Sequence, residues 1–335
     1  MQRDPEIPDT KTTARAWWVT GAGKGEIQDT PLEPQGSDEE EELVTVQALY
    51  SGISRGTESL VFHGRVPRSE YLAMRAPFQD GDFPWPVKYG YASVGEVIEG
   101  PVELVGQKVF CLYPHQDRYR VPASAVTPLP KKLPAERAIL AANMETAVNG
   151  LWDGTPAVGD RIAVVGLGVV GLLVAWLASR IPGTRVTAID TNPERQTIAE
   201  QLGLDFSSES GADDHDLVIH VSGHPSGLET ALGLAGQEAT IVEMSWYGDQ
   251  PVPAPLGAAF HPRRLTLKSS QVGQIVPSRV PRWDYRKRLG LALELLQDEA
   301  LDALITGECR FDDLPKSMAR ILIDGRETLC HRVVY

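Results

Sequence analysis

The chain has 335 residues, more than one hydrophobic core usually serves, so we expect two domains. Hydrophobic residues make up 42% and charged residues 23% of the sequence, which is ordinary for a globular protein and argues against long disordered regions. The formal net charge of -13 repels phosphate groups, so neither nucleic acid nor an anionic membrane surface is an expected partner.

The part of the chain before Met144 predicts an antiparallel β domain. It contains short alternating segments broken by Gly and Pro: ARAWWVTG, ELVTVQALYSG, SVGEVIEG, KVFCLY and YRVPAS. The first dozen residues include acids and lack an apolar stretch, so we expect a frayed end rather than a signal peptide. The acidic run from Ser37 to Glu42 is predicted to be a solvated loop between strands.

The cysteines point to a reducing compartment. Cys111, Cys309 and Cys330 are odd in number and form no CxxC pair, so the sequence encodes neither a disulfide framework nor a local thiolate zinc site. We therefore expect a cytoplasmic protein.

The stretch SGISRGTES at residues 51 to 59 contains G-x-S-x-G around Ser54, the pattern of a hydrolase nucleophile elbow. Three interpretations are open: a nucleophile, a remnant of a metal site, or part of a turn, since Gly and Ser are common turn residues. The pattern needs a structural context before any of the three is preferred.

Residues 161 to 180, RIAVVGLGVVGLLVAWLASR, give the strongest signal in the chain. A short apolar strand runs through Gly166, Gly168 and Gly171 directly into an apolar helix, the arrangement of a dinucleotide-binding loop. The glycines permit a tight turn, close approach of a pyrophosphate and close helix packing, and the helix N-terminus at Val169 and Val170 offers free amides. The apolar run Ile162 to Ala178 falls short of the ~20 residues of a membrane span.

A second strand ends at Asp190, 19 residues after Gly171, with Thr191 next. An acid at this position accepts hydrogen bonds from the adenosine ribose and repels a 2′-phosphate, which favours NAD, with NADP less likely. Further apolar runs, DLVIHVSG, ATIVEMSWYG and LTLKSSQVG, predict more strands of a parallel sheet, with a helix at LETALGLAG. The residues at their carboxyl ends are candidates for contact with the nicotinamide half of a cofactor: Ser222, Gly223, Trp246, Tyr247, Gln271 and Gly273.

The last part of the chain predicts a helix (DYRKRLGLALELLQ), a strand near Ala303 to Arg310, a helix (LPKSMARILIDG) and a terminal strand (CHRVVY). The basic run of Arg279, Arg282, Arg286, Lys287 and Arg288 is predicted to be a solvated helix start, with use by an anionic substrate as the alternative. The element order resembles the medium-chain dehydrogenase/reductase superfamily over essentially the whole chain. The resemblance implies a doubly wound Rossmann sheet inserted in a GroES-like antiparallel β catalytic domain, an α/β fold. The implied domains are 1–145 (catalytic), 146–278 (dinucleotide-binding) and 279–335 (return to the catalytic domain).

The resemblance also implies that catalytic zinc is absent. In zinc alcohol dehydrogenases of this superfamily a Cys binds zinc in a loop like GICGTDxH, and Ser54 occupies that position here. Tyr91 stands where the ligand His of a G-H-E motif would be, and the third ligand position falls in the segment Ala142 to Glu145. The four-cysteine structural lobe is missing as well. Within this superfamily the chain is most similar to a zinc-less branch that includes bacteriochlorophyllide hydroxyethyl dehydrogenases. The segments that carry this similarity are SGISRGTES, KYGY and PHQD.

Without a metal, a side chain must exchange a proton with the substrate oxygen. Tyr91 is the first candidate, with a nearby cation such as Lys88 or Arg55 expected to lower its pKa. Ser54 could relay the proton or hold the carbonyl oxygen, and Thr57 beside it is a further candidate. His115 lies on a segment that lines the substrate pocket in relatives and titrates near neutrality, so it is a candidate acid or base. Structural roles remain open for all of them. The resemblance further places Arg55 at the cofactor pyrophosphate and Thr146 near the nicotinamide. The other histidines show no partner spacing, and His224 lies in a loop on the cofactor side.

Three classes of function follow from these observations. The first is a metal-free NAD-dependent oxidoreductase that interconverts an alcohol and a carbonyl compound. The second is a reductase of activated double bonds like the quinone oxidoreductases, and the third is a non-catalytic dinucleotide-binding protein. The expected partners are a small-molecule substrate and a second copy of the chain, because LTLKSSQVG would leave an unpaired sheet edge.

Overall fold

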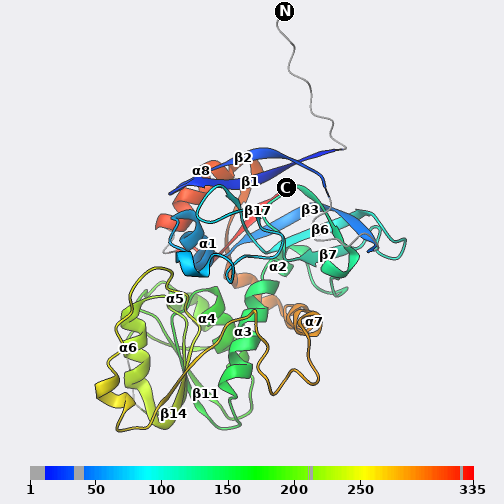
Figure 1. The fold of residues 1–335 in the computed structure, drawn as a ribbon. Helices are drawn as coiled ribbons and strands as arrows, with labels where there is room; N and C mark the ends of the chain where they lie inside the picture. The colour runs from blue at the N-terminus through cyan, green and yellow to red at the C-terminus, as the bar shows by residue number, and fades with distance from the viewer. Residues whose placement is uncertain (1–11, 34–40, 210, 212–213, 325–326) are drawn as a thin grey trace, which may run out of the picture. The chain divides into compact units, whose positions relative to one another are not determined.

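The computed structural model describes residues 12–33, 41–209, 211, 214–324 and 327–335. The chain divides into two compact units (Figure 1). The first contains the described residues up to Ile139 and those of Gly307–Gly325 and His331–Tyr335, and the second contains Leu140–Thr306 and the described residues of Arg326–Cys330. The expectations for a frayed N-terminus and for the acidic loop at residues 37–40 fall outside the described residues.

The first unit contains the predicted antiparallel β structure. Its larger sheet has the order β16-β17-β3-β6-β7-β9 with β8 also beside β3, and its smaller sheet has the order β2-β1-β5-β4. The C-terminal strand pairs with β3 so that Val333 lies opposite Ser51, which brings the end of the chain beside the SGISRGTES segment. The strands are β1 (Thr13–Gly21), β2 (Lys24–Pro31), β3 (Leu43–Ile53), β4 (Asp80–Gly81), β5 (Val87–Lys88), β6 (Ser93–Glu99), β7 (Lys108–Cys111), β8 (Arg118–Pro122), β9 (Thr127–Pro128), β16 (Ile305–Arg310) and β17 (Cys330–Val334).

The core of this unit forms because apolar side chains alternate with polar ones along much of β3, β6 and β8, whereas β7 is apolar and buried after Lys108. Val44, Val46, Val97 and Val109 are fully buried in one cluster with their aromatic and aliphatic neighbours. Short helices complete the unit: α1 (Arg55–Phe62), α2 (Ala135–Ala138) and α8 (Leu314–Ala319), the last continuing into a π-helical turn, η6 (Arg320–Asp324).

The second unit contains the predicted parallel sheet, whose strand order among the described residues is β12-β11-β10-β13-β14-β15. Every pair in it is parallel. The central strands are continuous apolar runs because helices cover both faces of the sheet. The strands are β10 (Arg161–Val165), β11 (Arg185–Ile189), β12 (Asp205–Ser207), β13 (His215–His220), β14 (Ala235–Glu243) and β15 (Thr266–Ser269).

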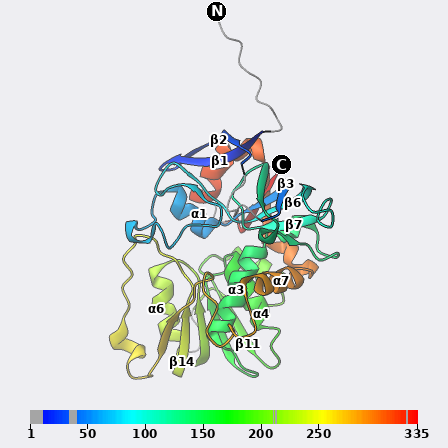
Figure 2. The ribbon, with the colours of Figure 1, turned by 45° about the vertical axis from the view of Figure 1, so that its right-hand side comes forward.

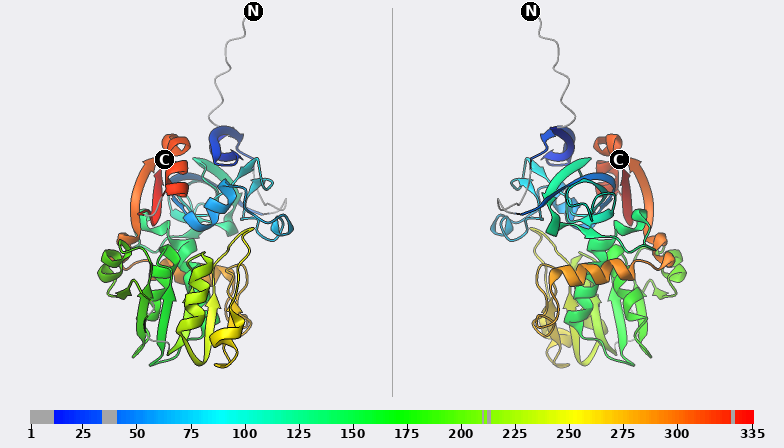
Figure 3. Two further views of the ribbon diagram at one scale, coloured as in Figure 1. Left: turned by 90° about the vertical axis from the view of Figure 1, so that its left-hand side faces the viewer. Right: turned by 90° about the vertical axis from the view of Figure 1, so that its right-hand side faces the viewer.

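The helices of the second unit pack on the sheet and on one another. Figure 2 shows α6 on one side of the sheet and α3 and α4 on the other. Figure 3 shows α7, drawn in orange, which contacts α3. The helices are α3 (Ala141–Gly154), α4 (Val169–Ala178), α5 (Arg195–Gln201), α6 (Pro225–Leu234) and α7 (Tyr285–Leu295), with short helical turns at η3 (Leu256–Phe260) and η4 (Glu299–Leu304). None of the helices in the described part of the chain combines the length and apolar character needed to cross a membrane.

The compact units differ from the domain boundaries predicted above. All of α3 belongs to the second unit because it packs on α4, so the division falls after Ile139 rather than after residue 145. Residues 279–306 also belong to the second unit because α7 packs on α3. The prediction of a solvated basic run is wrong for Arg288, which is 2% exposed, whereas its neighbours in the run are exposed.

Candidate functional site

The turn between β10 and α4 shows why each of its glycines is needed. Gly166 has a φ of +100°, and a Cβ there would lie 2.5 Å from the backbone nitrogen of Ser222. A Cβ on Gly171 would overlap the carbonyl oxygen of Gly166, so α4 approaches β10 this closely because a glycine stands there. Around Gly168, no described residue beyond its chain neighbours lies within 4 Å of the Cβ position. This turn therefore leaves open space beside the start of α4.

The start of α4 suits an anionic group. Gly168 is the N-cap residue, and the first amides of the helix, beginning at Val169 and Val170, lack intrahelical carbonyl partners. The helix dipole adds a partial positive charge at the same end. The loop therefore has the features that hold a phosphate or pyrophosphate group.

Asp190 is fixed beside this loop by two backbone amides. One carboxylate oxygen accepts the Leu167 N–H at 2.6 Å, and the other accepts the Asn192 N–H at 2.8 Å. Each oxygen keeps a second lone pair for a further donor, such as a ribose hydroxyl. Thr191, next in the chain, is exposed.

The predicted cofactor-side residues lie along one edge of the sheet. Ser222 and Gly223 follow β13, Trp246 and Tyr247 follow β14, and Gln271 and Gly273 follow β15, all at the carboxyl ends of the parallel strands. The strand order changes direction between β10 and β13, which is where open α/β sheets bind ligands. Thr146 lies in α3, and its hydroxyl donates to the Ala142 carbonyl at 2.9 Å.

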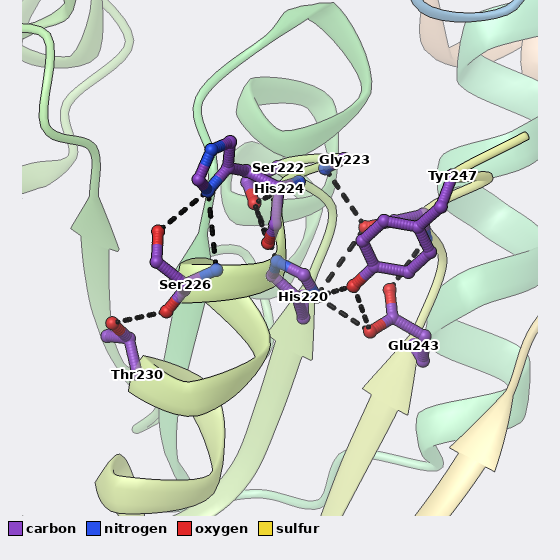
Figure 4. A network of polar contacts seen from close by, with 9 residues as sticks. His220, Ser222, Gly223, His224, Ser226, Thr230, Glu243 and Tyr247 are labelled. Atoms are coloured by element: carbon purple, nitrogen blue, oxygen red, sulfur yellow. Dashed lines mark hydrogen bonds and ion pairs between the residues drawn. The ribbon is translucent and has the colours of Figure 1, made fainter. Parts of the chain in front are cut away.

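A hydrogen-bonded chain occupies the carboxyl ends of β13 and β14 (Figure 4). His220 is fully buried, and its two ring nitrogens contact Ser222 Oγ at 2.6 Å (Nε2) and Glu243 Oε2 at 2.7 Å (Nδ1). The Tyr247 hydroxyl also donates to Glu243 Oε2, at 3.0 Å, and the Ser245 N–H donates to Glu243 Oε1, at 2.8 Å. We call these linked residues, Ser222, His220 and Glu243, the open chain, because Ser222 is exposed.

The electrostatics of the open chain favour an ionised Glu243. Burial works to raise the pKa of its carboxyl, but hydrogen bonds and charge from His220, with further hydrogen bonds from Ser245, bring the pKa below its usual value. Burial, followed by the charge of Glu243, raises the pKa of Tyr247, so its phenol stays protonated and donates. An ionised carboxylate on Nδ1 assigns the proton to that nitrogen and leaves Nε2 to accept from Ser222.

The first unit contains a second chain of the same residue types. His115 is 1% exposed, and its Nδ1 contacts Ser51 Oγ at 2.7 Å while its Nε2 contacts Glu58 Oε2 at 3.0 Å. The Tyr335 hydroxyl extends the chain, 2.9 Å from Ser51 Oγ. Ser51 is fully buried, so we call Ser51, His115 and Glu58 the closed chain.

Ser54 begins a helix rather than forming a nucleophile elbow. It is the N-cap residue of α1, and its N–H donates to Glu58 Oε1 at 2.7 Å. His115, which shares the partner Glu58 with Ser54, has its hydrogen bonds with Ser51 and Glu58. Arg55 donates through Nε to the Ile321 carbonyl at 3.0 Å, and Thr57 lies in the first turn of α1.

Tyr91 is partly exposed and packs edge to face against Tyr89, with ring centroids 6.0 Å apart. Lys88, one of the two cations expected near Tyr91, is 1% exposed and donates to Gln116 Oε1 at 3.0 Å. Its ammonium is 3.7 Å from Asp80 Oδ2. Strand β5 thus directs Lys88 into the interior of the unit, and its influence on the pKa of Tyr91 stays a prediction.

The donors available for a metal ion are few. In the described ranges, no group of three or more His, Cys, Asp or Glu side chains is arranged to hold a metal. Glu145, in the segment of the third zinc ligand, is instead paired with the buried Arg288, whose Nε donates to Glu145 Oε1 at 3.0 Å. Arg288 also donates to Asn149 Oδ1 and to the Val272 carbonyl, both at 2.5 Å. This explains why the predicted solvated run buries one of its arginines.

Sequence analysis did not single out His220 or Glu243, and it did not place Glu58 beside His115. A signal for the open chain was present in the strand ends. His220 and Ser222 are two residues apart, as are Glu243 and Ser245, so each pair extends to the same side of its strand. Adjacent parallel strands then place the two pairs side by side, since His220 lies opposite Glu243.

Comparison with known proteins gives relatives of one kind, although no family model matches the chain. (R,R)-butanediol dehydrogenase of Bacillus subtilis is 26% identical over 277 residues, which is 68% of this chain and 75% of that protein. Several other curated relatives match over about half of their own length or less, among them dehydrogenases of D-guloside and L-threonine.

Solved structures show the same fold over nearly the whole chain. L-idonate 5-dehydrogenase of Escherichia coli K-12 superposes with a TM-score of 0.77 at 16% identity, covering 96% of this chain and 98% of that one. An alcohol dehydrogenase of Escherichia coli CFT073, described as short-chain and complexed with NADH, gives a TM-score of 0.76 at 17% identity, covering 97% and 100%. Together with the glycine-rich loop and the two kinds of sheet, these relatives show that the chain belongs to the medium-chain dehydrogenase/reductase superfamily, as an alcohol dehydrogenase-like oxidoreductase.

Proposed function

We propose that the protein is a metal-free, NAD(H)-dependent oxidoreductase that interconverts an alcohol and a carbonyl compound. The observation that carries the proposal is the β10–α4 turn, where open space at Gly168, the start of α4 and the fixed carboxylate of Asp190 fit a dinucleotide. The relatives that act on butanediol, guloside and threonine support an alcohol as the substrate class.

In this proposal the second unit holds the cofactor. The first amides of α4 bind the pyrophosphate, and Asp190 accepts hydrogen bonds from the adenosine ribose hydroxyls. A carboxylate at that position repels a 2′-phosphate, so NADH is preferred to NADPH. When bound, the nicotinamide ring supplies or accepts the hydride at the carbinol carbon.

The proton is handled by the first unit without a metal. Ser54 and Tyr91 stand at two of the ligand positions of zinc-containing relatives, and a hydroxyl and a phenol are poor ligands for Zn²⁺. Glu145, the one carboxylate in the segment of the third position, is paired with Arg288. Tyr91 is the proposed proton donor to the carbonyl oxygen during reduction, and its phenolate takes the proton back during oxidation.

The closed chain gives His115 a supporting role in this mechanism. The imidazole is buried, and a Cβ on Gly90 would lie 3.0 Å from His115 Cδ2, so the ring sits directly beneath the turn that leads to Tyr91. His115 is thus a positioning residue for Tyr91, and Glu58 orients it.

Calorimetric titration and elemental analysis of the purified protein test the proposal. We expect NADH to bind at least tenfold more tightly than NADPH, Asp190→Ser to narrow that gap, and Asp205→Ser, an exposed acid on β12, to leave it unchanged. Stoichiometric zinc would overturn the metal-free mechanism, and equal affinities would overturn the cofactor assignment.

A substrate screen that follows NADH absorbance tests the reaction class. Secondary alcohols and polyols related to butanediol, threonine and idonate form the first panel, with quinones and enones as the second. Turnover confined to the second panel would favour double-bond reduction, and binding of NADH without turnover on any substrate would favour a non-catalytic role.

The proposal includes a symmetric homodimer. Strand β15 is an edge of the parallel sheet in the described residues, and Leu267 on it is 38% exposed. An unpaired edge of this kind is commonly covered by the same strand of a second copy. Light scattering should give twice the chain mass of 36.6 kDa at micromolar concentration, and a single-chain mass would contradict the dimer.

A further inference from the structure

The open chain has the geometry of a nucleophilic serine site. Its histidine is within hydrogen-bonding distance of both a serine hydroxyl, at 2.6 Å, and a carboxylate, at 2.7 Å, through opposite ring nitrogens. A serine activated by a base that is itself oriented by a third group is the arrangement that makes serine nucleophilic. The arrangement lies entirely within the second unit, and its chemistry does not require the proposed oxidoreductase function, although Ser222 is also one of the residues predicted to face the cofactor.

The surroundings of the open chain separate the parts that must be buried from the part that must be accessible. His220 is 0% exposed and the Glu243 side chain 15%, so the charge–imidazole pair is shielded from water. Ser222 is exposed, in the turn between β13 and α6. Figure 4 shows Ser222 and Glu243 near His220, and they contact its two different ring nitrogens.

Two further features support a reactive hydroxyl. The His224 N–H donates to Ser222 Oγ at 3.1 Å and would stabilise negative charge on that oxygen. Helix α6 begins three residues later at Pro225, with its positive end toward the turn. Gly227 makes room for the arrangement, because a Cβ there would overlap both Ser222 Oγ and His220 Nε2.

We propose that Ser222, His220 and Glu243 form a second reactive site that accepts acyl and phosphonyl groups, with small activated carboxylic esters as its substrate class. Ser222 Oγ attacks the ester carbonyl, and its proton passes to His220 Nε2. The bond to the alcohol breaks, and the alcohol leaves with that proton. Water then hydrolyses the acyl–serine, again through His220, which releases the carboxylic acid and restores the serine hydroxyl.

Labelling with a biotinylated fluorophosphonate tests the site in the full-length protein. Ser222 attacks phosphorus, fluoride leaves, and the adduct is located by peptide mass spectrometry. We expect labelling at Ser222, a loss of at least 100-fold in rate in both Ser222→Ala and His220→Gln, and hydrolysis of p-nitrophenyl acetate that falls in parallel. Ser222→Ala alters one exposed hydroxyl, so it tests the site even where His220→Gln is less stable.

Ser226→Ala is the matched control, since Ser226 is exposed on α6 and contacts His224 rather than His220. Its labelling should equal that of the unaltered protein. Absence of labelling at Ser222, or labelling that survives in His220→Gln, would overturn the proposal. Addition of NADH separates the two proposals: protection of Ser222 supports the cofactor position as well, whereas labelling without protection supports the reactive serine and counts against the cofactor position.

Discussion

The described residues include two hydrogen-bonded Ser–His–Glu chains, one in each compact unit, and they differ in the exposure of the serine. In the closed chain Ser51 is fully buried, and in the open chain Ser222 is exposed. The imidazole is also used in opposite senses, with the serine on Nδ1 of His115 but on Nε2 of His220. The same three residue types can therefore stabilise a fold or present a reactive hydroxyl. Solvent access to the serine distinguishes these two roles.

The closed chain ties together segments that are distant in sequence. Ser51 lies on β3, Glu58 on α1, His115 in the loop before β8, and Tyr335 at the end of the chain. Burial raises the pKa of Tyr335, so its phenol remains a neutral hydrogen-bonding group. The open chain instead joins two neighbouring strand ends, whose positions the parallel sheet already fixes.

The open chain and the closed chain should differ most in how much each contributes to the free energy of unfolding. His115→Ala removes one partner each from Glu58 and Ser51, which keep the Ser54 N–H and the Tyr335 hydroxyl but are too deeply buried to turn to water, so it should cost about 3 kcal/mol in the free energy of unfolding. His220→Ala should cost about 1 kcal/mol, because Ser222 can turn to water and Glu243 keeps Tyr247 and Ser245. Differential scanning calorimetry measures both, since it resolves units that unfold separately.

The exposed His261 supplies the control for this comparison, and His261→Ala should change stability by less than about 0.5 kcal/mol. Equal losses of unfolding free energy in His115→Ala and His220→Ala would contradict the assignment of a structural role to the closed chain and a reactive role to the open chain.

The second comparison asks which side chain of the first unit handles the proton. If the closed chain only positions its neighbours, Tyr91→Phe should lower kcat about 100-fold, as loss of a general acid does. Ser54→Ala should lower it by a few-fold at most, because Ser54 contributes its backbone N–H to Glu58.

Steady-state rates over a range of pH, with the substrate found in the screen, distinguish these outcomes. Tyr71→Phe, which removes a phenol that packs on Phe83 in the same unit, should leave kcat unchanged. A larger effect in Ser54→Ala than in Tyr91→Phe would transfer the proton-donor role to Ser54.

His115 and His220 are each packed against a glycine, Gly90 and Gly227 respectively, and this offers a third comparison. Gly90→Ala should destabilise the protein by about 2 kcal/mol, because its φ of +133° strains any other residue and His115 is 3.0 Å away. Gly227→Ala should also cost about 2 kcal/mol, since the new methyl group would overlap Nε2 of the buried His220 as well as Oγ of the exposed Ser222.

Fluorophosphonate labelling should separate the two glycine variants. Gly227→Ala should slow labelling of Ser222 about tenfold, because the new methyl group separates the serine from His220, and Gly90→Ala should leave it unchanged. Slower labelling in Gly90→Ala would mean that the closed chain, or a general loss of stability, governs the reactivity.

The sequence predicted most of the fold because its strongest signals are local. The glycine-rich turn, Asp190 at the end of the second strand and the apolar runs of the parallel sheet each correspond to an observed element. The observed edge strand β15 was predicted as well. The domain boundaries were less accessible, since the assignment of residues 279–306 depends on α7 packing on α3, a contact between segments more than 100 residues apart.

The residues of the candidate sites also fall into those that a local sequence pattern places and those that only distant packing places. Predicted residues near the glycine-rich loop lie where the strand ends place them, whereas Lys88 and Arg288 are buried by packing that no local pattern reveals. His115 was recognised by its segment, but its partners Ser51 and Glu58 come from β3 and α1. Contacts that depend on the pairing of distant segments require the structure.

The smallest expected effect concerns pH and the carboxylate of the open chain. The pKa of Glu243 is lowered in the folded protein, so its ionised form stabilises the fold. That contribution is fully present above the ordinary glutamate pKa of about 4.3 and is lost as the pH falls through the lower folded value. Glu243→Gln has no such titration, so the stability advantage of the unaltered protein over this variant should shrink as the pH is lowered below about 4.3.

Glu145 provides a control of opposite sign in the same unit. Burial raises its pKa, ahead of the opposing effects of Arg288, so its ionisation destabilises the fold as the pH rises through the raised value. Glu145→Gln should therefore gain on the unaltered protein with rising pH, whereas Glu243→Gln should lose. Thermal unfolding of the three proteins between about pH 3 and 7 measures both trends, since that range brackets the ordinary glutamate pKa. Parallel curves for the two variants would show that Glu243 is not held as a carboxylate, and the open chain would then lack the charge that its proposed reactivity requires.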